Sequence, residues 1–254
     1  MQGRVVLVTG AGSGIGEAVC VRMAREGAEV VVTSRSQAGV RRTAALVDEV
    51  GGRVPMAEVL DVREREAAER VASQAGERFG RIDVVCNNAG VELSRAPAID
   101  EVTDEEWDLI MGVNVRGTFL VTRASLPYMP DGGAIVNVGS INSFAAWPND
   151  VPYTTSKGAV LQFTRALALD LAARRIRVNC VCPGIIDTPL TRAFVAAADD
   201  PAAAVAEYEA AAPLGRMGTP EEVANCVLFL ASEEAAFVTG TALLVDGGTL
   251  ATAG

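Results

Sequence analysis

Tyr153 and Lys157 are spaced so that both side chains would lie on one face of a helix, and Ser140 ends an apolar run upstream. A tyrosine hydroxyl normally has a pKa of about 10, too high for easy proton exchange near neutrality. An ammonium about 4 Å away, at an effective dielectric near 20, would stabilise the phenolate by roughly 4 kcal/mol, or about three pKa units. We therefore interpret Tyr153 as an acid or base whose pKa Lys157 lowers. Taken alone, the pair would rather indicate an amphipathic helix with an exposed lysine, and the other motifs decide between the two.

The composition restricts the chemistry that is available. The 254-residue chain has no histidine, which excludes a Ser-His-Asp group and any histidine-ligated metal. Its five cysteines lack paired spacing, so we expect reduced thiols in a cytoplasmic protein, with Cys180 and Cys182 in the core and no metal site. The net charge of -10 argues against nucleic-acid binding. Since no apolar run reaches about eighteen residues and the N-terminus lacks a signal layout, we expect neither membrane association nor secretion.

Apolar, β-branched runs alternate with helix-like segments along the whole chain. Such a pattern is typical of a parallel sheet that is buried on both faces. We expect one doubly wound, Rossmann-type α/β domain over residues 1–254, with a seven-stranded parallel sheet flanked by helices. The expected strands are Arg4–Val8, Glu29–Thr33, Val54–Val59, Ile82–Cys86, Ala134–Val138, Ile176–Val181 and Ala242–Val245. The expected helices are Gly14–Glu26, Ala38–Val50, Glu64–Phe79, Asp104–Tyr128, Val151–Ala173 and Pro220–Ala231.

The segment Ile185–Met217, which includes the alanine-rich run Ala193–Ala212, has no place in this sheet. It follows the carboxyl end of a strand, and sheets of this kind bind ligands at that edge. We expect a mobile helical lid over the substrate at about residues 185–217, with a surface insertion as the alternative.

A glycine-rich turn, Thr9–Gly16, follows the first strand and opens the first helix. Its spacing departs from the strict G-x-G-x-x-G fingerprint, and no Gly-Lys-Ser/Thr ending of a P-loop follows. Glycines here would let a pyrophosphate approach the free N–H groups of the helix N-terminus. The turn therefore predicts a dinucleotide site.

The residues at the end of the second strand bear on the choice of dinucleotide. Proteins that bind NAD usually place a carboxylate there for the adenosine ribose, whereas this chain has Ser34 and Arg35. A guanidinium can hold a 2′-phosphate through two hydrogen bonds, so NADP(H) is favoured. The alternative is that Arg35 is a solvated loop residue that stacks on the adenine of either cofactor, which leaves NAD(H) open.

Taken in order along the chain, these residues resemble the short-chain dehydrogenase/reductase family, and the match covers nearly the whole sequence. The resemblance implies an NAD(P)(H)-dependent oxidoreductase that interconverts a ketone or aldehyde and a secondary alcohol by direct hydride transfer, without a metal. The matching motifs are Thr9–Gly16, Asp61 with Val62, Asn87–Gly90, Asn114, Ser140, Tyr153 with Lys157, and Pro183–Gly184 with Thr188.

The resemblance also implies catalytic roles. Tyr153 would be the general acid in reduction and the base in oxidation, while Lys157 lowers its pKa and holds the nicotinamide ribose. Ser140 would hydrogen-bond the substrate oxygen. Asn114 would hold a water that links Lys157 to solvent; bonding of this mid-helix side chain to backbone is a second role that is compatible with the first.

The family's cofactor contacts carry over in the same way. Asp61 would meet the adenine ring, with an N-cap of the following helix as the alternative, and Asn87 is expected to be structural. The implied cofactor-binding residues are Gly10, Ser13, Gly14, Ile15, Gly16, Ser34, Arg35, Asp61, Val62, Asn88, Ala89, Gly90, Tyr153, Lys157, Pro183, Gly184, Ile186 and Thr188.

Substrate contacts are expected from Val91–Pro97, from Ile141–Pro152 and from the lid. A small ketone, a sugar-like polyol or another secondary alcohol ranks above a 3-oxoacyl thioester, because the acidic chain offers no obvious basic surface for an acidic carrier protein. A fused-ring ketone stays open. The resemblance of Val238–Gly248 to the family's subunit-packing region implies a homotetramer or a dimer.

A protein that senses NADP(H) without turnover would use the same glycine-rich turn. The complete set of Ser140, Tyr153, Lys157 and Asn114 favours an enzyme, because a sensor has no need of a tuned phenol.

Overall fold

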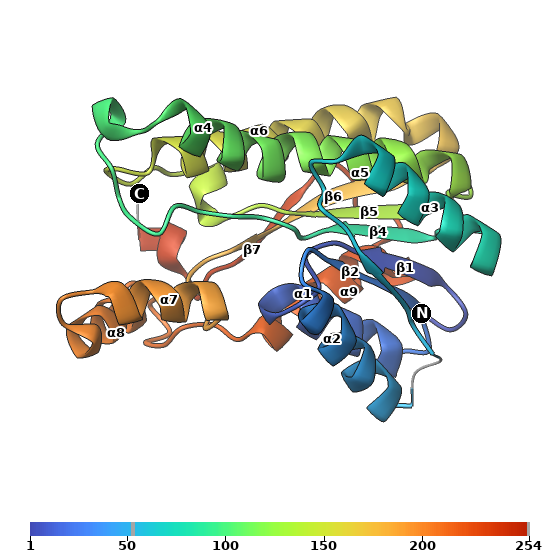
Figure 1. The fold of residues 1–254 in the computed structure, drawn as a ribbon, viewed down its shortest axis with the longest axis horizontal. Coiled ribbons are helices and arrows are strands. Elements are labelled where there is room, and N and C mark those ends of the chain that lie inside the picture. Colours follow the sequence, from blue (N-terminus) through green and yellow to red (C-terminus); the bar gives the residue numbers. More distant parts are fainter. Residues whose placement is uncertain (52–53, 253–254) are drawn as a thin grey trace.

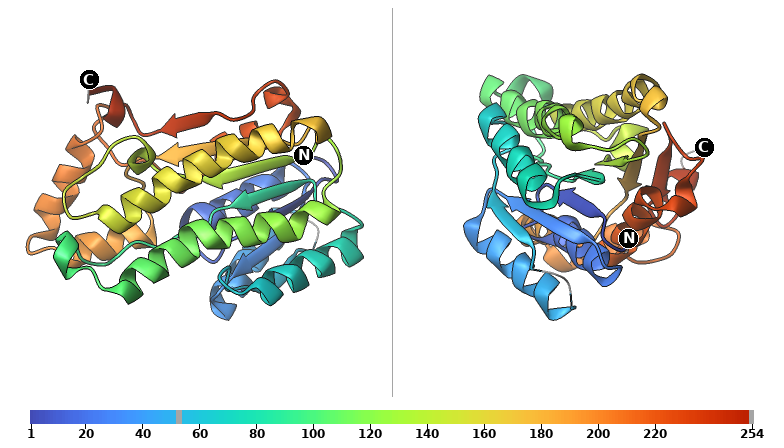
Figure 2. Two further views of the ribbon diagram at one scale, coloured as in Figure 1. Left: turned by 90° about the horizontal axis from the view of Figure 1, so that it is seen from above. Right: turned by 90° about the vertical axis from the view of Figure 1, so that its right-hand side faces the viewer.

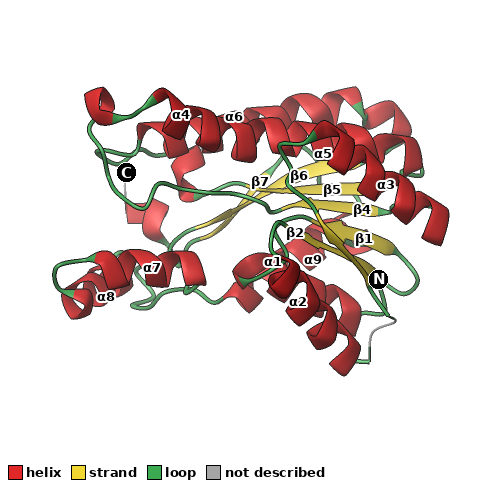
Figure 3. Cartoon of the chain, in the orientation of Figure 1, coloured by secondary structure: helices red, strands yellow, loops and turns green. Residues whose placement is uncertain are grey.

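Within residues 1–51 and 54–252, which the computed structural model describes, seven strands lie parallel in one sheet of order β3-β2-β1-β4-β5-β6-β7 (Figures 1 and 3). This arrangement confirms the predicted doubly wound domain. The order reverses between β1 and β4, and in sheets of this type ligands bind outside the carboxyl ends at such a switch point. The strands are β1 Val5–Val8, β2 Glu29–Ser34, β3 Met56–Val59, β4 Val84–Asn87, β5 Ala134–Val138, β6 Arg177–Pro183 and β7 Ala242–Val245.

Helices cover both faces of the sheet. Helices α3, α4, α5 and α6 form one layer, and α1, α2 and α9 form the other (Figures 1 and 2). Their bounds are α1 Gly14–Arg25, α2 Gln37–Glu49, α3 Arg65–Phe79, α4 Asp104–Met111, α5 Thr118–Ser125, α6 Val151–Asp170 and α9 Pro220–Ala231.

Burial on both faces explains why the strands are nearly continuous apolar runs. In β1, Val6 and Val8 pack into the cluster shared with α1 and α9, while Val5 and Leu7 pack into the cluster shared with α3 and α5. Successive side chains of a strand point to opposite faces, so both sets must be apolar.

The predicted long helix Asp104–Tyr128, whose composition is interrupted by Gly112, Asn114 and Gly117, is divided at those residues in the structure. Residues Gly112–Gly117 between α4 and α5 are π-helical, and Leu126–Tyr128 form a 3-10 turn. Asn114 lies in the π-helical segment, and its side chain bonds the backbone of Val91. An insertion into the helical ladder of this kind is common at functional sites.

Other predicted boundaries shift at the ends of elements. Strand β3 begins at Met56 rather than Val54, and β6 runs to Pro183 because Cys182 and Pro183 pair with β7. Helix α6 ends at Asp170, and a 3-10 turn over Ala172–Arg174 follows it.

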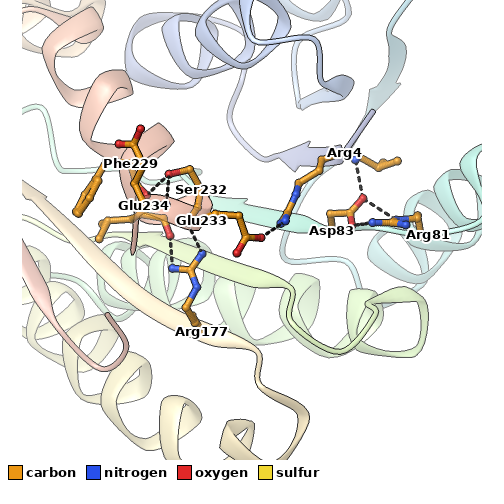
Figure 4. A network of polar contacts seen from close by, with 10 residues as sticks. Arg4, Arg81, Asp83, Arg177, Phe229, Ser232, Glu233 and Glu234 are labelled. Atoms are coloured by element: carbon orange, nitrogen blue, oxygen red, sulfur yellow. Dashed lines mark hydrogen bonds and ion pairs between the residues drawn. The ribbon is translucent and has the colours of Figure 1, made fainter. Parts of the chain in front are cut away.

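A polar network closes the amino ends of the strands (Figure 4). The buried carboxylate of Asp83 accepts the Val5 N–H at 2.8 Å and pairs with Arg81. Arg177 donates to the carbonyl oxygens of Leu230 at 2.6 Å and Ser232 at 3.0 Å. These contacts fasten the edge of the sheet that lies opposite the carboxyl ends, where the predicted site residues lie.

The expected lid segment forms two helices, α7 Pro189–Ala197 and α8 Pro201–Ala210. They project beyond the carboxyl ends of the strands, toward which the arrows point in the left view of Figure 2. Ile186 and Gly218 form a bridge that holds the two ends of this segment together. Among the described helices, none combines the length and apolarity that a membrane crossing requires.

Candidate active site

The four predicted catalytic residues come from three elements that meet at the carboxyl edge of the sheet. Ser140 follows β5, Tyr153 and Lys157 lie in the first two turns of α6, and Asn114 lies between α4 and α5. Ser140, Lys157 and Asn114 are buried, while Tyr153 is partly exposed. A helix start at Val151, with Pro152 in its first turn, presents Tyr153 toward this edge.

Lys157 does not act on Tyr153 as the sequence predicts. Its Nζ donates to the carbonyl oxygen of Val138 at 2.9 Å and lies 5.4 Å from the centroid of the Tyr153 ring. Burial raises the pKa of Tyr153 well above its ordinary value, and the charge of Glu92 raises it further. Burial also lowers the pKa of Lys157. The prediction of a lowered Tyr153 pKa is therefore wrong for the protein without cofactor, because desolvation disfavours the phenolate.

Ser140 belongs to a hydrogen-bonded chain that the sequence did not reveal. Its Oγ donates to Asn142 Oδ1 at 3.1 Å, and Asn142 Nδ2 donates to Asp150 Oδ2 at 2.5 Å and to Thr154 Oγ1 at 3.2 Å. Thr154 Oγ1 in turn donates to Asp150 Oδ2 at 2.9 Å. Because both amide hydrogens of Asn142 are engaged, its oxygen must face Ser140.

The side chain of Asn114 forms hydrogen bonds with the backbone, which is the second of the two roles that the sequence predicted for it. Its amide nitrogen donates to the Val91 carbonyl and to Ser156 Oγ, both at 2.9 Å, and its oxygen accepts the Val91 N–H at 2.8 Å. The first residues of the loop after β4 are thereby fixed beside the catalytic groups. The water relay stays a prediction.

Glu92 follows this clamped residue and is partly buried. Burial, and then the charge of Asp150, raise its pKa to about 7, against an opposing effect of Lys157. Burial raises the pKa of Tyr208 in α8, and the charge of Glu92 raises it further. Both residues fall in segments from which the sequence predicted substrate contacts, Val91–Pro97 and the lid, but neither was named as a site residue.

Cys180 and Cys182 pack in the core, as expected, but they also lie beneath the site. Their sulfur atoms are 3.6 Å apart, and a methyl group built on Gly139 would lie within 3 Å of both. The pKa of Cys182 is lowered, first by the hydrogen bond to Cys180. Within the described residues, no group of three or more Cys, Asp or Glu side chains could hold a metal ion.

The glycine-rich turn is packed too tightly for side chains. Methyl groups built on Gly10 and Gly16 would lie 2.7 Å from Ala89 Cα and 2.5 Å from Asn88 Nδ2. Gly10 and Gly14 also have positive φ angles of 64° and 57°, which favour glycine.

The first turn of α1 has free donors beside this turn. Ser13 is the N-cap of α1, yet its side chain makes no capping hydrogen bond, so the N–H groups around Gly14, Ile15 and Gly16 keep their capacity for an anion. A methyl group built on Gly14 would lie 3.5 Å from Thr188, which faces this turn from the start of α7. These residues fit the diphosphate of a dinucleotide.

Asp61 does not cap the following helix. Glu64 is the N-cap of α3, and Asp61 pairs with Arg63, whose Nη2 lies 2.7 Å from Asp61 Oδ2. The hydrogen bond from Arg63 lowers the pKa of Asp61, and Arg35 contributes a smaller effect of the same sign. The N-cap alternative is therefore wrong. Val62 is buried beneath Gly117.

The remaining predicted cofactor residues line the same edge. Asn88 Nδ2 donates to the carbonyl oxygens of Thr9 at 2.9 Å and Gly10 at 3.2 Å, so it braces the glycine-rich turn. A methyl group on Gly90 would lie 3.5 Å from Lys157 Nζ. The continuation of β6 supplies Pro183, Gly184 and Ile186.

Asn87 and Thr188 make structural hydrogen bonds. Asn87 Nδ2 donates to Asn137 Oδ1 at 2.8 Å and to Thr122 Oγ1 at 2.9 Å inside the core. Thr188 Oγ1 accepts the Thr191 N–H at 3.3 Å and thereby caps α7. A contact of the Thr188 hydroxyl with cofactor stays a prediction.

Comparisons with known proteins agree with this arrangement. A family model described as enoyl-(acyl carrier protein) reductase matches residues 10–249. The 3-oxoacyl-(acyl-carrier-protein) reductase FabG of Thermotoga maritima is 39% identical over 250 residues, which cover 98% of each chain. The structure of levodione reductase matches with a TM-score of 0.94, 34% identity and 99% coverage of both chains. A 3-ketoacyl-(acyl-carrier-protein) reductase from Brucella melitensis, solved with NADH, gives a TM-score of 0.88, 35% identity and 98% coverage of both chains.

Proposed function

The chain belongs to the short-chain dehydrogenase/reductase family, and on this premise we propose that it interconverts a ketone or aldehyde and a secondary alcohol by direct hydride transfer with NAD(P)(H). The observation that carries the proposal is the meeting of Ser140, Tyr153 and Lys157 at the carboxyl edge, next to a turn that fits a diphosphate. A bound nicotinamide ring would supply or accept the hydride.

The chain's own residues would position the cofactor. The N–H groups of Gly14, Ile15 and Gly16 would bind the diphosphate at the start of α1, where the helix dipole favours an anion. Gly90 leaves space beside Lys157 Nζ, which supports a contact of this ammonium with the nicotinamide ribose. Asp61, Val62, Asn88 and Ala89 would line the adenosine part.

Proton transfer would be the task of Tyr153. Because burial raises the pKa of its hydroxyl, Tyr153 is protonated near neutrality and suited to donate to a carbonyl oxygen during reduction. Ser140 would hydrogen-bond the same oxygen and stabilise the charge that develops there. In oxidation, Tyr153 would accept the proton from the alcohol only as a phenolate, so its pKa would have to fall when oxidised cofactor binds beside Lys157.

The end of β2 supports NADP(H) over NAD(H). Arg35 is exposed and has no hydrogen-bond or ion-pair partner within the described part of the chain, whereas Arg63 is engaged by Asp61. A free guanidinium beside Ser34 can bind a 2′-phosphate. The Brucella melitensis relative with bound NADH keeps NAD(H) as the second choice.

A carbonyl panel assayed with NADPH and then with NADH tests both proposals. We expect turnover on at least one ketone, with kcat/KM for NADPH at least about tenfold above that for NADH. Arg35→Ala should reduce kcat/KM with NADPH at least about tenfold and leave the value with NADH within about twofold. A wild-type preference for NADH would overturn the NADP(H) proposal. Cofactor binding without hydride transfer to any substrate would overturn the enzymatic one.

A 3-oxoacyl thioester is the second candidate substrate. The 39% identity to FabG of Thermotoga maritima favours it. Acetoacetyl-CoA and an acyl-carrier-protein thioester belong in the panel for this reason. A kcat/KM for either thioester well above that for every small ketone would make this chain a thioester reductase.

The surface supports self-association. Phe237 is fully exposed and Leu169 is 80% exposed, and a subunit contact would bury such apolar side chains. We infer a homotetramer or a dimer, to be tested by light scattering coupled to size-exclusion chromatography. A monomer at micromolar concentration would contradict this.

Two further expectations stay proposals. We infer that α7 and α8 act as a substrate lid, supported by the effect of Glu92 on the pKa of Tyr208. Hydrogen exchange in α8 should slow when substrate and cofactor bind.

All five cysteines are free, which supports a reducing, cytoplasmic environment.

A further inference from the structure

Asp150 is the N-cap residue of α6, yet its side chain does not cap the helix. An aspartate at this position usually accepts a hydrogen bond from a backbone N–H of the first turn. Here Asp150 Oδ2 instead accepts hydrogen bonds from Asn142 Nδ2 at 2.5 Å and from Thr154 Oγ1 at 2.9 Å. The carboxylate is thus committed to the segment that follows Ser140 rather than to the free N–H groups of its own helix.

The turn before α6 holds Asp150 in this position. Asn149 has a φ of 61°, in the left-handed region that few residues other than glycine adopt. Asn149 is exposed, so packing in the core does not account for its conformation. Backbone strain of this kind persists where the surrounding structure demands it, and it is frequent at functional sites. The strained residue leads directly into the one whose carboxylate binds Asn142.

The carboxylate of Asp150 determines which way the Asn142 amide faces. An ionised carboxylate only accepts hydrogen bonds, so Asn142 must turn its amide nitrogen toward Asp150. The Thr154 hydroxyl donates its single proton to Asp150 at 2.9 Å and accepts the second amide hydrogen at 3.2 Å. The amide oxygen Oδ1 is therefore left to face Ser140, whose Oγ donates to it at 3.1 Å.

The main chain of Ser140 is held separately from its side chain. Ser143 Oγ accepts the Ser140 N–H at 3.3 Å and donates to the carbonyl oxygen of Lys157 at 2.8 Å. The freedom that remains is that of the Ser140 side chain, and Asn142 restricts it twice. The Asn142 backbone N–H donates to Ser140 Oγ at 3.2 Å, and Oδ1 accepts the hydroxyl proton. This proton can turn toward a substrate oxygen by rotation about the Cβ–Oγ bond, which moves no heavy atom.

Resting on the proposed oxidoreductase function, we propose that Asp150 is a positioning residue that fixes the Ser140 hydroxyl through Asn142. Asp150 itself contacts neither the substrate nor the cofactor. It orients the Asn142 amide, and the amide holds Ser140 Oγ where the substrate oxygen would bind. Loss of the carboxylate therefore lowers the rate of the chemical step and leaves the affinity for substrate nearly unchanged.

Asp150→Ala tests this at about pH 8, where an aspartate is ionised. The single-turnover rate of NAD(P)H oxidation at saturating ketone should fall at least about fivefold, because a mobile hydroxyl stabilises the developing charge less well. The ketone concentration that gives half of this rate should change less than about threefold. Asp150→Asn keeps an acceptor oxygen for Asn142 and should be faster than Asp150→Ala. Asp170→Ala, which removes an exposed carboxylate at the last residue of the same helix, should leave both quantities unchanged.

A double variant separates the route through Asn142 from a direct effect on α6. If Asp150 acts through Asn142, then Asn142→Ala with Asp150→Ala should have a rate within about twofold of Asn142→Ala alone, whereas independent effects would multiply. Asp150→Ser repeats the test with a residue that favours the N-cap position but is one bond too short to replace the carboxylate, so that it should be as slow as Asp150→Ala. Cofactor binding and thermal unfolding establish that each variant is folded.

The possible failures can be told apart. A smaller loss in folded Asp150→Ala or Asp150→Ser, no recovery in Asp150→Asn, or a further loss beyond about twofold in the double variant overturns the positioning role while hydride transfer itself stands. A large rise in the half-saturating ketone concentration with an unchanged rate makes Asp150 a substrate contact and overturns it as well. No turnover of any carbonyl or alcohol by the wild type refutes the proposed function, and the inference with it.

Discussion

The Lys157 ammonium nitrogen lies 5.4 Å from the centroid of the Tyr153 ring and donates its hydrogen bond to the carbonyl of Val138. The shared helix face that the sequence predicts is therefore present, but the pair is not a direct ammonium–phenol contact. In the protein alone, burial governs Tyr153 and keeps it protonated. Any lowering of its pKa must come when cofactor binds and changes the charge and hydrogen bonding around Lys157.

The ionisation of Tyr153 can be measured without substrate. In the free protein, the ultraviolet difference between wild type and Tyr153→Phe should show no phenolate from this residue below about pH 10. Burial disfavours the charged form, so the pKa shift is upward. With oxidised cofactor bound, the transition should move to lower pH. A phenolate signal near pH 7 in the free protein would show that Lys157 controls Tyr153 without help.

Because the pKa of Glu92 is raised, the unfolding free energy of the protein should depend on the ionisation of this residue. Its folded-state pKa of about 7 exceeds the ordinary value of 4.5, so its contribution to stability is complete below about pH 4.5 and is lost as the pH rises through about 7. Glutamine does not ionise, so Glu92→Gln should not lose stability as the pH rises through this range. Relative to wild type, the variant should gain up to about 3 kcal/mol in unfolding free energy between pH 4.5 and pH 8.

Urea unfolding at the two pH values checks this. The groups that face Glu92, namely Asp150, Tyr153, Lys157 and Tyr208, are the same in both proteins, so their own titration largely cancels in the comparison. A difference between wild type and variant that does not depend on pH would mean that the carboxylate is hydrated in the folded protein.

Asn142 positions Ser140, and its removal should affect turnover more than affinity. Asn142→Ala removes the acceptor at 3.1 Å from Ser140 Oγ and leaves Asp150 without one donor. We expect kcat to fall roughly tenfold, because a loosely oriented hydroxyl stabilises the developing charge less well. The KM should change less than about threefold.

An exposed asparagine provides the comparison for this variant. Asn225→Ala in α9 removes only a surface contact with Arg22 and should leave kcat unchanged. Equal kcat values for Asn142→Ala and wild type would show that Asn142 does not position the Ser140 hydroxyl for catalysis.

Gly10 should not tolerate a side chain. At its φ of 64°, an added methyl group would meet Ala89 Cα at 2.7 Å, which is backbone and cannot give way. Gly10→Ala should lose about 1–3 kcal/mol of unfolding free energy. Gly158→Ala, at a helical position with no atom within 4 Å, should instead gain about 0.5–1 kcal/mol. Denaturant titration of both variants distinguishes a local clash from a general intolerance of alanine.

The fold was predictable because its signal repeats along the chain. The run Val5–Val8 is apolar on both faces, and Ala134–Val138 is interrupted only by Asn137. The alternation of such runs with helices leaves a doubly wound sheet as the expected outcome. The glycine-rich turn and the pair Tyr153 and Lys157 were visible because their spacing is local.

Contacts between distant segments were not predictable in this way. The hydrogen bond from Asn142 to Asp150 and the hydrogen bonds between Asn114 and Val91 depend on how the loops fold back. The pKa of Tyr153 was predicted with the wrong sign because spacing along a helix says nothing about desolvation. The alternative role of Asp61 as an N-cap failed because Arg63, two residues later, engages its carboxylate.

The central claim is that the hydroxyl of Tyr153 transfers the proton that accompanies hydride transfer. Single-turnover oxidation of bound NAD(P)H by the best carbonyl substrate should be at least about a thousandfold slower in Tyr153→Phe than in wild type, with the dissociation constant for cofactor within about threefold. If Tyr153→Phe keeps a rate within tenfold of wild type while it binds cofactor normally, another group supplies the proton and the proposed mechanism is wrong.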